Sequence, residues 1–416
     1  MRQRPIQPRA LWPAALALFS VFWTTAAGRG EDIVIGMSAA FRGPSRGLGT
    51  ELYRGAMAYF SSVNAAGGVH GRRIVIKAYD DGYDPNRAVD NTMRLLDEDK
   101  VFLLFGYVGT PTTTRVLPLL AQRRAESVYL FCPFTGATPL RQPPYGDRVF
   151  NLRASYRDET RDLVDHFVTV GRKRIAVFYQ IDNYGRSGWC GVRQALAARG
   201  LSITAEATYR RGTSFDADMM PQVALLRRAA PDAVICVGAY AACAAFIRDA
   251  RDQGWDVPIA NVSFVGSENL LALLQKAGAA RGKDYTHDLV NSQVVPSYNR
   301  LALEAVREYR RLMDRYRPQP PASLADPEYQ PLPYSFVSFE GFLDAKLLVK
   351  LLEDLGPNLR REQIQAAAEH IKNFSLGLDA PVSFTPEHHQ GLDRVYCTTV
   401  EHGQFVRLTD WTRWKQ

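Results

Sequence analysis

The stretch Val63-Asn64-Ala65-Ala66-Gly67-Gly68-Val69-His70-Gly71, followed by Tyr79-Asp80-Asp81-Gly82-Tyr83-Asp84-Pro85, decides the fold prediction. Gly67-Gly68 is expected to end a helix, because glycine adopts the left-handed backbone angles of a helix end without steric cost. After an intervening strand, Asp84-Pro85 is expected to cap and begin the next helix. This order of strands, turns and helices is typical of the opening of a ligand-binding lobe, and it favours a binding protein over an enzyme.

Strand and helix patterns alternate along most of the chain. Strands are expected over 33–37, 73–78, 101–105 and 127–131, with helices over 51–64, 84–96 and 112–124 between them. The pattern restarts near Arg153, with helices expected over 157–170, 187–199, 216–229 and 241–253, and strands over 174–179, 203–209, 233–237 and 258–263. Residues 300–316, 337–355 and 361–372 are expected to be helical, and Arg317–Pro333 a long loop. Helices between successive strands predict an α/β protein with two doubly wound parallel-sheet lobes, between which the chain crosses more than once.

Composition agrees with a soluble protein of two domains. The 416 residues are 46% hydrophobic and 23% charged, and a chain of this length exceeds one ordinary core. The net charge is +8, and no basic stripe with interleaved aromatic residues is present, so nucleic acid is not an expected partner. Five cysteines without a Cys-x-x-Cys pair do not form a disulfide framework, although an oxidising compartment permits one bridge such as Cys236–Cys243.

Residues 1–27 are predicted to be a secretory signal peptide, which implies export from the cytoplasm. Arg2, Arg4 and Arg9 precede the apolar stretch 10–23, and Thr25-Ala26-Ala27 resembles a cleavage site. The alternative is a membrane anchor, but the apolar stretch is shorter than the roughly 20 residues that a span needs. No cysteine precedes Cys132, so no lipid-carrying cysteine is expected, and removing the three arginines lowers the net charge to +5.

Sequence signatures of catalysis are missing. The chain has no Gly-x-Ser-x-Gly elbow, phosphate-binding loop or His-Glu-x-x-His motif, so no enzymatic activity, cofactor or metal is expected. His388-His389 is expected in a solvated turn rather than at a metal. Asp80-Asp81 is expected to shape a turn, because adjacent side chains at a strand end point to opposite faces.

Polar and glycine-rich turns follow two successive strands of the first lobe. Gly106 to Thr113 includes Gly109 and Thr110 and opens a helix, and Pro133 to Ala137 includes Phe134 and Gly136. Helix N-termini offer free N–H groups that suit a carboxylate, and Thr110 adds a hydroxyl. Each turn alone is explained equally well as helix capping, but together they favour an anion-binding cleft at the carboxyl ends of the strands.

The second lobe has matching turns. Tyr184, Tyr240 and Ser263 each follow or end an expected strand. A tyrosine at a cleft edge can stack on a small ligand while its hydroxyl stays hydrogen-bonded. Taken alone, either tyrosine fits a place in the core or on the surface better than one in a binding site.

The order of these motifs resembles that of the type I periplasmic binding proteins of branched-chain amino acid ABC transporters, from about Asp32 to Phe405. The segments that carry the resemblance are Gly43-Pro44 with Leu48-Gly49, Asn64–Gly71, Tyr79-Asp80-Asp81 with Asp84-Pro85, Phe105-Gly106 with Thr110, Arg174–Val177 with Tyr184-Gly185, and Pro231–Val234.

The resemblance implies the type I periplasmic binding protein fold, in which two lobes joined by three crossovers close on a ligand by hinge motion. Lobe one would comprise residues 28–151 and 293–385, and lobe two residues 152–292 and 386–416. The hinge would include Val294-Val295-Pro296. The family's carboxylate-binding hydroxyl falls at Thr110, beside Gly109, and its next donors fall at Phe134 and Gly136. Its aromatic contacts in lobe two fall at Tyr184 and Tyr240, and Phe134 and Tyr156 would add aromatic walls.

The chain also departs from the family pattern. A pocket-lining aromatic of the family falls at Leu48, and a disulfide near the cleft falls at Tyr83 and Gly109 and is therefore absent. The acid that pairs with a ligand ammonium group falls at Ser263 when strand ends are aligned, which we favour, or at Glu268 when the Gly-x-Glu pattern is aligned. Without an acid at this position a buried ammonium would lack a counter-charge, so a carboxylate or an amide fits better than an α-amino acid.

The resemblance implies a periplasmic solute-binding protein that is monomeric, needs no cofactor and delivers a small carboxylate, amide or amino-acid-like ligand to an ABC permease in the inner membrane. The alternative is a periplasmic sensing subunit that presents the bound ligand to a membrane receptor. Both would use the same binding site, so the sequence does not separate them.

Overall fold

Two separate β-sheets organise the protein in this computed structural model, which describes residues 1–3 and 30–416. The first sheet is parallel throughout, with the strand order β2-β1-β3-β4-β5. Its strands are β1 (Ile33–Ala39), β2 (Ile74–Asp80), β3 (Leu104–Phe105), β4 (Leu130–Phe131) and β5 (Val149–Phe150). Residues 4–27 of the predicted signal peptide lie outside the described residues.

The second sheet has the order β12-β11-β10-β9-β8-β6-β7. Its first five strands in the chain pair in parallel, whereas β11 and β12 join one edge as antiparallel strands. The strands are β6 (Ile175–Gln180), β7 (Ala205–Tyr209), β8 (Ala233–Val237), β9 (Ile259–Asn261), β10 (Leu289–Gln293), β11 (Tyr396–Glu401) and β12 (Gln404–Arg407).

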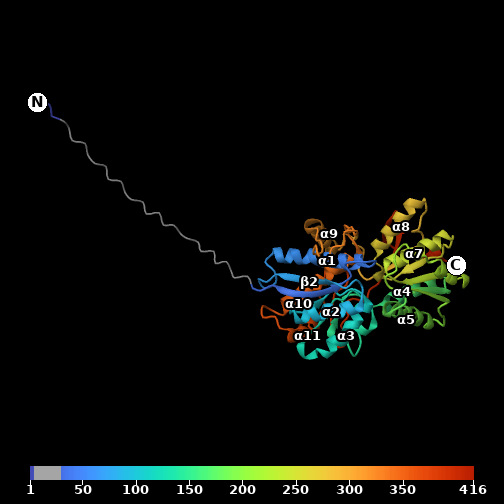
Figure 1. Cartoon of the computed structure of the whole chain (residues 1–416), viewed down its shortest axis with the longest axis horizontal. Coiled ribbons are helices and arrows are strands. Elements are labelled where there is room, and N and C mark those ends of the chain that lie inside the picture. Colours follow the sequence, from blue (N-terminus) through green and yellow to red (C-terminus); the bar gives the residue numbers. More distant parts are fainter. Residues whose placement is uncertain (4–29) are drawn as a thin grey trace.

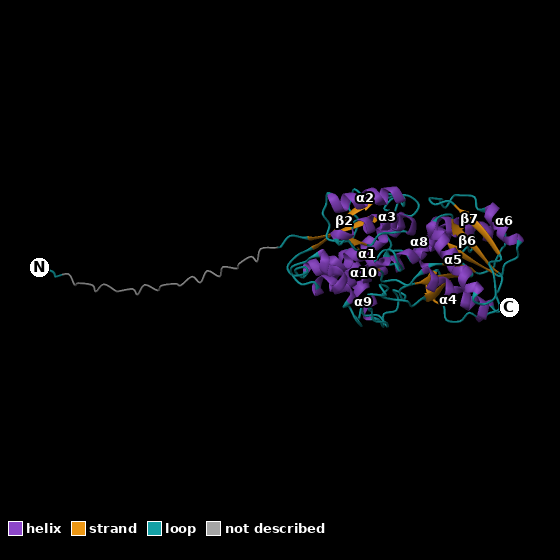
Figure 2. Cartoon of the chain, turned by 90° about the horizontal axis from the view of Figure 1, so that it is seen from below, coloured by secondary structure: helices purple, strands orange, loops and turns teal. Residues whose placement is uncertain are grey.

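The helices divide between the two sheets, as Figures 1 and 2 show. We call each sheet with its helices a lobe. The first lobe contains α1 (Arg46–Ala65), α2 (Pro85–Asp97), α3 (Thr110–Gln122), α9 (Glu304–Tyr316), α10 (Phe336–Asp354) and α11 (Ile364–Glu369). The second lobe contains α4 (Tyr156–Thr169), α5 (Asn183–Ala197), α6 (Met220–Arg228), α7 (Tyr240–Asp252) and α8 (Ser267–Arg281).

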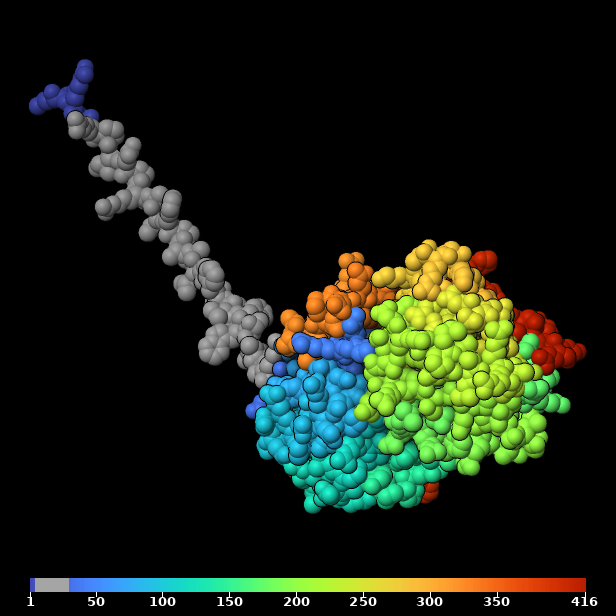
Figure 3. All heavy atoms as spheres, turned by 45° about the vertical axis from the view of Figure 1, so that its right-hand side comes forward, coloured from blue at the N-terminus to red at the C-terminus, as the bar shows by residue number. Residues whose placement is uncertain are grey.

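The chain passes between the lobes three times, after β5, after β10 and before β11. The last passage returns the C-terminal segment to the second lobe, where it lies as a red patch beside green and yellow atoms in Figure 3. The first and third crossovers lie side by side, because Asn151 forms a parallel bridge with Gln390. The predicted architecture of two doubly wound lobes with three crossovers is therefore confirmed, and the exact lobe boundaries stay a prediction.

The turns that decided the fold prediction behave as expected. Gly67 and Gly68 follow α1 with φ angles of 109° and 78°. The carboxylate of Asp84 caps α2 by accepting hydrogen bonds from the N–H groups of Asn86 and Arg87 at 2.8 and 3.1 Å. These contacts satisfy two of the N–H groups that a helix start leaves free.

Several element boundaries differ from the prediction. Helix α1 begins at Arg46 rather than at residue 51. The prediction started it too late because Gly47 and Gly49 give the first turns a poor helix propensity. Strands β3 and β4 are shorter than predicted, and the start of α6 lies at Met220 rather than at residue 216. Helix α8 and strands β5, β10, β11 and β12 were not predicted. All five cysteines are free, so the permitted Cys236–Cys243 bridge is not formed.

Among the described residues, no helix combines the length and the apolar character needed to cross a membrane.

Helices α1 and α10 are in backbone contact at Gly55. A Cβ atom placed on Gly55 would lie 1.7 Å from the carbonyl oxygen of Ser338. We therefore expect Gly55→Ala to lower the free energy of unfolding by about 1–3 kcal/mol through overpacking, measured by urea denaturation. Alanine favours an isolated helix by about 1 kcal/mol, so unchanged or increased stability would contradict this close approach.

Candidate functional site

The loops that follow β3 and β4 meet the start of α4 at the interface between the lobes. Thr110 is the first residue of α3, and no side chain caps this helix start. The Thr110 hydroxyl lies 2.6 Å from the Thr135 hydroxyl and 3.3 Å from the Tyr156 hydroxyl. All three residues are buried, and we call them the hydroxyl cluster.

Two glycines allow this close packing. A Cβ atom on Gly136 would lie 2.6 Å from both the ring and the backbone nitrogen of Tyr156. A Cβ atom on Gly109, which has a φ of 104°, would lie 2.2 Å from the Tyr83 ring. Tyr83 and Gly109, the two positions at which the family's disulfide falls, are thus neighbours, and the tyrosine ring occupies the space between them.

Aromatic rings from both lobes surround the hydroxyl cluster. Phe264, in the short 3-10 helix η4 (Ser263–Val265), lies 5.3 Å from Phe134 and 4.6 Å from Tyr184 between ring centroids. Tyr184 is 5.2 Å from Tyr156, and Tyr83 is 6.1 Å from Phe264. We call these five residues the aromatic cluster. Phe264 and Tyr83 were not predicted as site residues, although Phe264 directly follows the predicted Ser263.

Arg153 lies beside this cluster at the first crossover between the lobes. Its guanidinium carbon lies 4.6 Å from the centre of the Phe134 ring, and its Nη2 donates a hydrogen bond to the Ser263 hydroxyl. Its charge is shared by Glu159 at 3.5 Å and Glu340 at 3.4 Å. Arg153 is 1% exposed, yet its Nε and Nη1 atoms have no hydrogen-bond acceptor among the described residues.

The electrostatics of Arg153 keep it charged. Burial acts to lower the pKa of Arg153, but the carboxylates of Glu340 and Glu159 outweigh burial and raise it. Burial raises the pKa of Glu340 to about 7, against the opposing effect of Arg153. The group therefore contains one permanent cation facing two buried acids.

Ser263 lies beside Arg153, and its other partner is Glu159, an acid that the sequence analysis did not identify. Glu159 accepts hydrogen bonds from the Ser263 N–H at 2.7 Å, the Ser263 hydroxyl at 3.0 Å and the Ser292 hydroxyl at 2.6 Å. Both carboxylate oxygens are thus occupied by groups of the protein. Glu159 therefore has no free oxygen to pair with a ligand ammonium group.

Tyr240 and Glu268 lie at another part of the interface. The Tyr240 hydroxyl accepts a hydrogen bond from the N–H of Gly47 at the start of α1, at 3.1 Å. Glu268 accepts from the N–H of Phe336 at the start of α10, at 3.3 Å. The structure therefore places Thr110, Gly109, Phe134, Gly136, Tyr156, Tyr184 and Ser263 in one group, whereas Tyr240 and Glu268 contact the starts of α1 and α10.

Two details of the predicted turns are corrected, at Phe134 and at His389. The backbone N–H of Phe134 is not a free donor, because it bonds to the carbonyl of Tyr107 at 2.7 Å; its ring forms a wall instead. The N–H of Gly136 does remain without an acceptor among the described residues. His389 is not solvated: it is buried, stacks 4.0 Å from Phe150 and lies 3.1 Å from Glu369.

Asp80 and Asp81 act within their turn. Asp80 accepts from the N–H groups of Phe41 and Gly82, and Asp81 accepts from the Ser38 hydroxyl and the Tyr83 N–H, both at 2.8 Å. These bonds satisfy the backbone where β1 and β2 end.

A cavity of about 340 Å³ opens beside the hydroxyl cluster. It lies between the lobes, where Asn183 donates a hydrogen bond to the Thr114 hydroxyl at 3.2 Å. Its lining includes Thr110, Thr114, Ala137, Arg157, Asn183 and Arg186. The two arginines give this entrance a positive rim, which favours the approach of an anion.

Comparison with known proteins gives a consistent family. The sequence model of a family described as "Periplasmic binding protein" matches residues 32–404. An "Amino acid binding protein" from Pseudomonas aeruginosa is 28% identical over 229 residues. That match covers 54% of this chain and 58% of the relative, so it spans less than two thirds of the relative's length.

Solved structures extend the likeness over most of the chain. A possible leucine/isoleucine/valine-binding protein from Rhodopirellula baltica is 33% identical with a TM-score of 0.81, covering 93% of this chain and 99% of that one. A branched chain amino acid ABC transporter protein from Thermus thermophilus, solved with bound valine, is 18% identical with a TM-score of 0.77. It covers 92% of this chain and 96% of that one, and it shows the shared fold.

Proposed function

The chain belongs to the periplasmic binding protein family, a family of solute-binding proteins and not of enzymes, and we propose that it captures a small carboxylate with an aromatic or branched apolar body between its two lobes. The ligand would then be delivered to an ABC permease. The protein would act in the periplasm as a monomer, after removal of residues 1–27 as a signal peptide.

Arg153 is the observation that carries this proposal. A buried guanidinium is costly unless acceptors complete its hydrogen bonds, and here Nε has no acceptor within the described part of the chain, while Nη1 is ion-paired with Glu340 at 3.4 Å without a hydrogen bond. Thr110 and the N–H of Gly136 supply further donors from the first lobe. A ligand carboxylate between these groups would accept hydrogen bonds from all of them. Charge-assisted hydrogen bonds between arginine and a carboxylate are stronger than hydrogen bonds between neutral groups.

The aromatic cluster favours an apolar body behind the carboxylate. Phe134, Tyr156, Tyr184 and Phe264 are consecutive neighbours with centroid separations of 4.6–5.3 Å, and the Tyr156 hydroxyl lies 3.3 Å from that of Thr110. The rings occupy the space between the lobes, so we propose that hinge opening admits the ligand and closure stacks the rings on it.

A ligand ammonium group is disfavoured in this site. Glu159 accepts three hydrogen bonds from the protein and faces Arg153, so it has no free oxygen for a new cation. Glu268, the other candidate acid, has an Oε2 that is unpartnered among the described residues, but it lies at the start of α10, where its Oε1 accepts from the N–H of Phe336, and not beside the hydroxyl cluster. The absence of a free acid beside the hydroxyl cluster, in the part of the chain that the structure describes, supports a ligand that has a carboxylate but no α-amino group. The names of the relatives indicate amino acids as the ligands of those relatives.

The proposal is tested by thermal shift and calorimetry of the mature protein against matched pairs. Each pair compares an acid with its α-amino acid and its amide, such as 3-phenylpropanoate with phenylalanine and 3-phenylpropanamide. A ligand at about 100 times its Kd should add roughly 2.7 kcal/mol of stability. Stabilisation by the acids alone would support the proposal, whereas stabilisation only by the α-amino acids would overturn it.

Thr110 supplies a sharper test. We expect Thr110→Ala to weaken binding of the best acid by about 1–3 kcal/mol, because it removes a hydrogen bond to a charged group. Thr112→Ala is the control, since the Thr112 hydroxyl donates to the carbonyls of Val108 and Gly109, just before α3, at 2.7 and 2.9 Å, and its loss leaves the Thr110 hydroxyl in place. Equal affinity of wild type and Thr110→Ala in calorimetry would show that Thr110 only shapes the helix start.

A further inference from the structure

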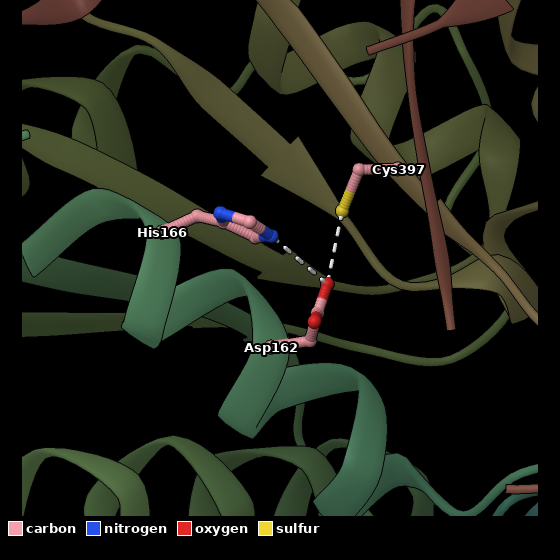
Figure 4. Close-up of side chains that lie close together, drawn as sticks. All are labelled: Asp162, His166 and Cys397. Carbon is pink, nitrogen blue, oxygen red and sulfur yellow. Dashed lines mark hydrogen bonds and ion pairs between the residues drawn. The ribbon is translucent and has the colours of Figure 1, made fainter. Parts of the chain in front are cut away.

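Asp162, His166 and Cys397 bring a carboxylate, an imidazole and a thiol together in the second lobe. Asp162 and His166 lie on α4, and Cys397 lies on β11, as Figure 4 shows. Their nearest ligand atoms all lie within 4.8 Å of one another. We propose that these three side chains form a binding site for Zn²⁺, separate from the site proposed for the carboxylate.

The distances suit a single small metal ion. The Cys397 Sγ lies 3.2 Å from Asp162 Oδ2, and the His166 Nε2 lies 3.7 Å from the same oxygen. Zinc–ligand distances of about 2.0–2.3 Å in a tetrahedron place neighbouring ligand atoms about 3.3–3.5 Å apart. These two separations lie on either side of this range, and the ligand atoms of all three residues lie within 4.8 Å of one another, so side-chain rotations can bring them into coordination.

The protein holds the ligands in position from several sides. Asp162 and His166 are four residues apart, which places them on one face of α4. The His166 ring lies parallel to Trp411 at 4.4 Å, with an interplanar angle of 6°, and this stack directs Nε2 toward Asp162. Cys397 is 7% exposed and is held by its strand.

The site is also accessible. A cavity of about 320 Å³ is lined by the three residues together with Trp411, Val395, Tyr396, Arg407, Leu408 and Thr409. His166 and Asp162 keep 42% and 35% of their side-chain surface exposed. Three protein ligands and an open side leave a fourth position for water, as in zinc sites that are not fully closed. Arg407 is exposed, so its charge can turn toward solvent.

The donor set selects zinc over the alkaline-earth ions. Calcium and magnesium take oxygen ligands, whereas a thiolate and an imidazole suit zinc and its neighbours among the transition metals. The Cys397 thiol donates its hydrogen bond to Asp162, so metal loading releases one proton from sulfur to solvent as the zinc–sulfur bond forms. Bound zinc would tie β11, which begins directly after the third crossover, to α4.

Cobalt substitution tests the site directly on the metal-free mature protein. We expect one equivalent of Co²⁺ to bind with a thiolate-to-cobalt charge-transfer band, and equimolar Zn²⁺ to displace it and to raise the Tm by several degrees. Cys397→Ser and His166→Gln should abolish the band. His166→Gln changes a partly exposed residue, so it tests the site even where Cys397→Ser impairs folding.

Two controls separate this site from adventitious metal binding. Cys190→Ser removes another free thiol, and His287→Gln removes a histidine that pairs with Asp256 at 2.8 Å without a cysteine. Both variants should keep the band. Absence of a stoichiometric band in the wild type, its survival in Cys397→Ser, or its equal loss in Cys190→Ser would overturn the proposal.

Discussion

Replacing Arg153 with methionine is expected to lower the free energy of unfolding by about 3–5 kcal/mol. Glu159 and Glu340 are both buried and face this one guanidinium at 3.5 and 3.4 Å. Removing the cation leaves buried carboxylates without a counter-charge, and breaking a buried pair in this way costs several kcal/mol. Ser263 also loses the hydrogen bond that it accepts from Arg153.

Urea denaturation of three variants measures this effect. Arg153→Met is compared with Arg94→Met, which breaks an exposed ion pair to Glu98 and should cost less than about 1 kcal/mol. The double variant Arg153→Met/Glu159→Gln should recover part of the loss, because it removes one of the two stranded carboxylates. A loss below about 1 kcal/mol for Arg153→Met would contradict the ion-pair network.

The same variants separate stability from binding. If Arg153 contacts a ligand carboxylate, the double variant should fold yet remain unable to bind the acid that binds the wild type. Full affinity in the folded double variant would assign Arg153 to the architecture of the crossover alone.

The fold was predictable because its decisive residues act locally. Asp84 caps the helix that follows it, and Gly67-Gly68 ends the helix that precedes it, through backbone preferences that need no distant partner. Strands β11 and β12 were missed for the opposite reason. Strand β11 pairs with β10, which ends about a hundred residues earlier in the chain. The pairing therefore depends on the third crossover, which brings the chain back to this sheet.

The residues of the candidate site that lie in turns directly after strands could be predicted from the sequence. Thr110, Phe134 and Gly136 follow successive strands, and the structure brings them together with Tyr156. Arg153 and Glu159 were missed, because nothing in the local pattern distinguishes a buried charged residue from an exposed one near a helix start. Only the three-dimensional arrangement shows that each of these charges neutralises the other.

Glu268 leads to a prediction about pH. Burial raises the pKa of Glu268 from 4.5 to about 8, and its Oε2 has no hydrogen-bond donor among the described residues. Between pH 4.5 and 8 the folded protein therefore holds a proton that the unfolded chain has released. Unfolding releases this proton, so stability is greatest at the acidic end of this window and falls as the pH rises toward 8.

We expect Glu268→Gln to remove this part of the pH dependence. A shift of one pKa unit is worth about 1.4 kcal/mol, so ionisation of Glu268 should cost the wild type about 2–4 kcal/mol between pH 5 and pH 8. The neutral amide keeps an acceptor for the N–H of Phe336 but has no proton to lose. The variant should thus match the wild type near pH 5 and exceed it near pH 8 in urea denaturation.

The other buried acids set what remains of the pH dependence. Burial also raises the pKa of Asp81 and of Glu340 to about 7 and that of Asp344 well above its usual range, so the stability of Glu268→Gln should still fall as the pH rises, but less steeply than that of the wild type between pH 7 and 8. Glu353→Gln, at an exposed position, is the control and should follow the wild-type curve. Parallel curves for Glu268→Gln and the wild type from pH 5 to pH 8 would show that Glu268 is already ionised in the folded protein, with a partner that compensates its charge.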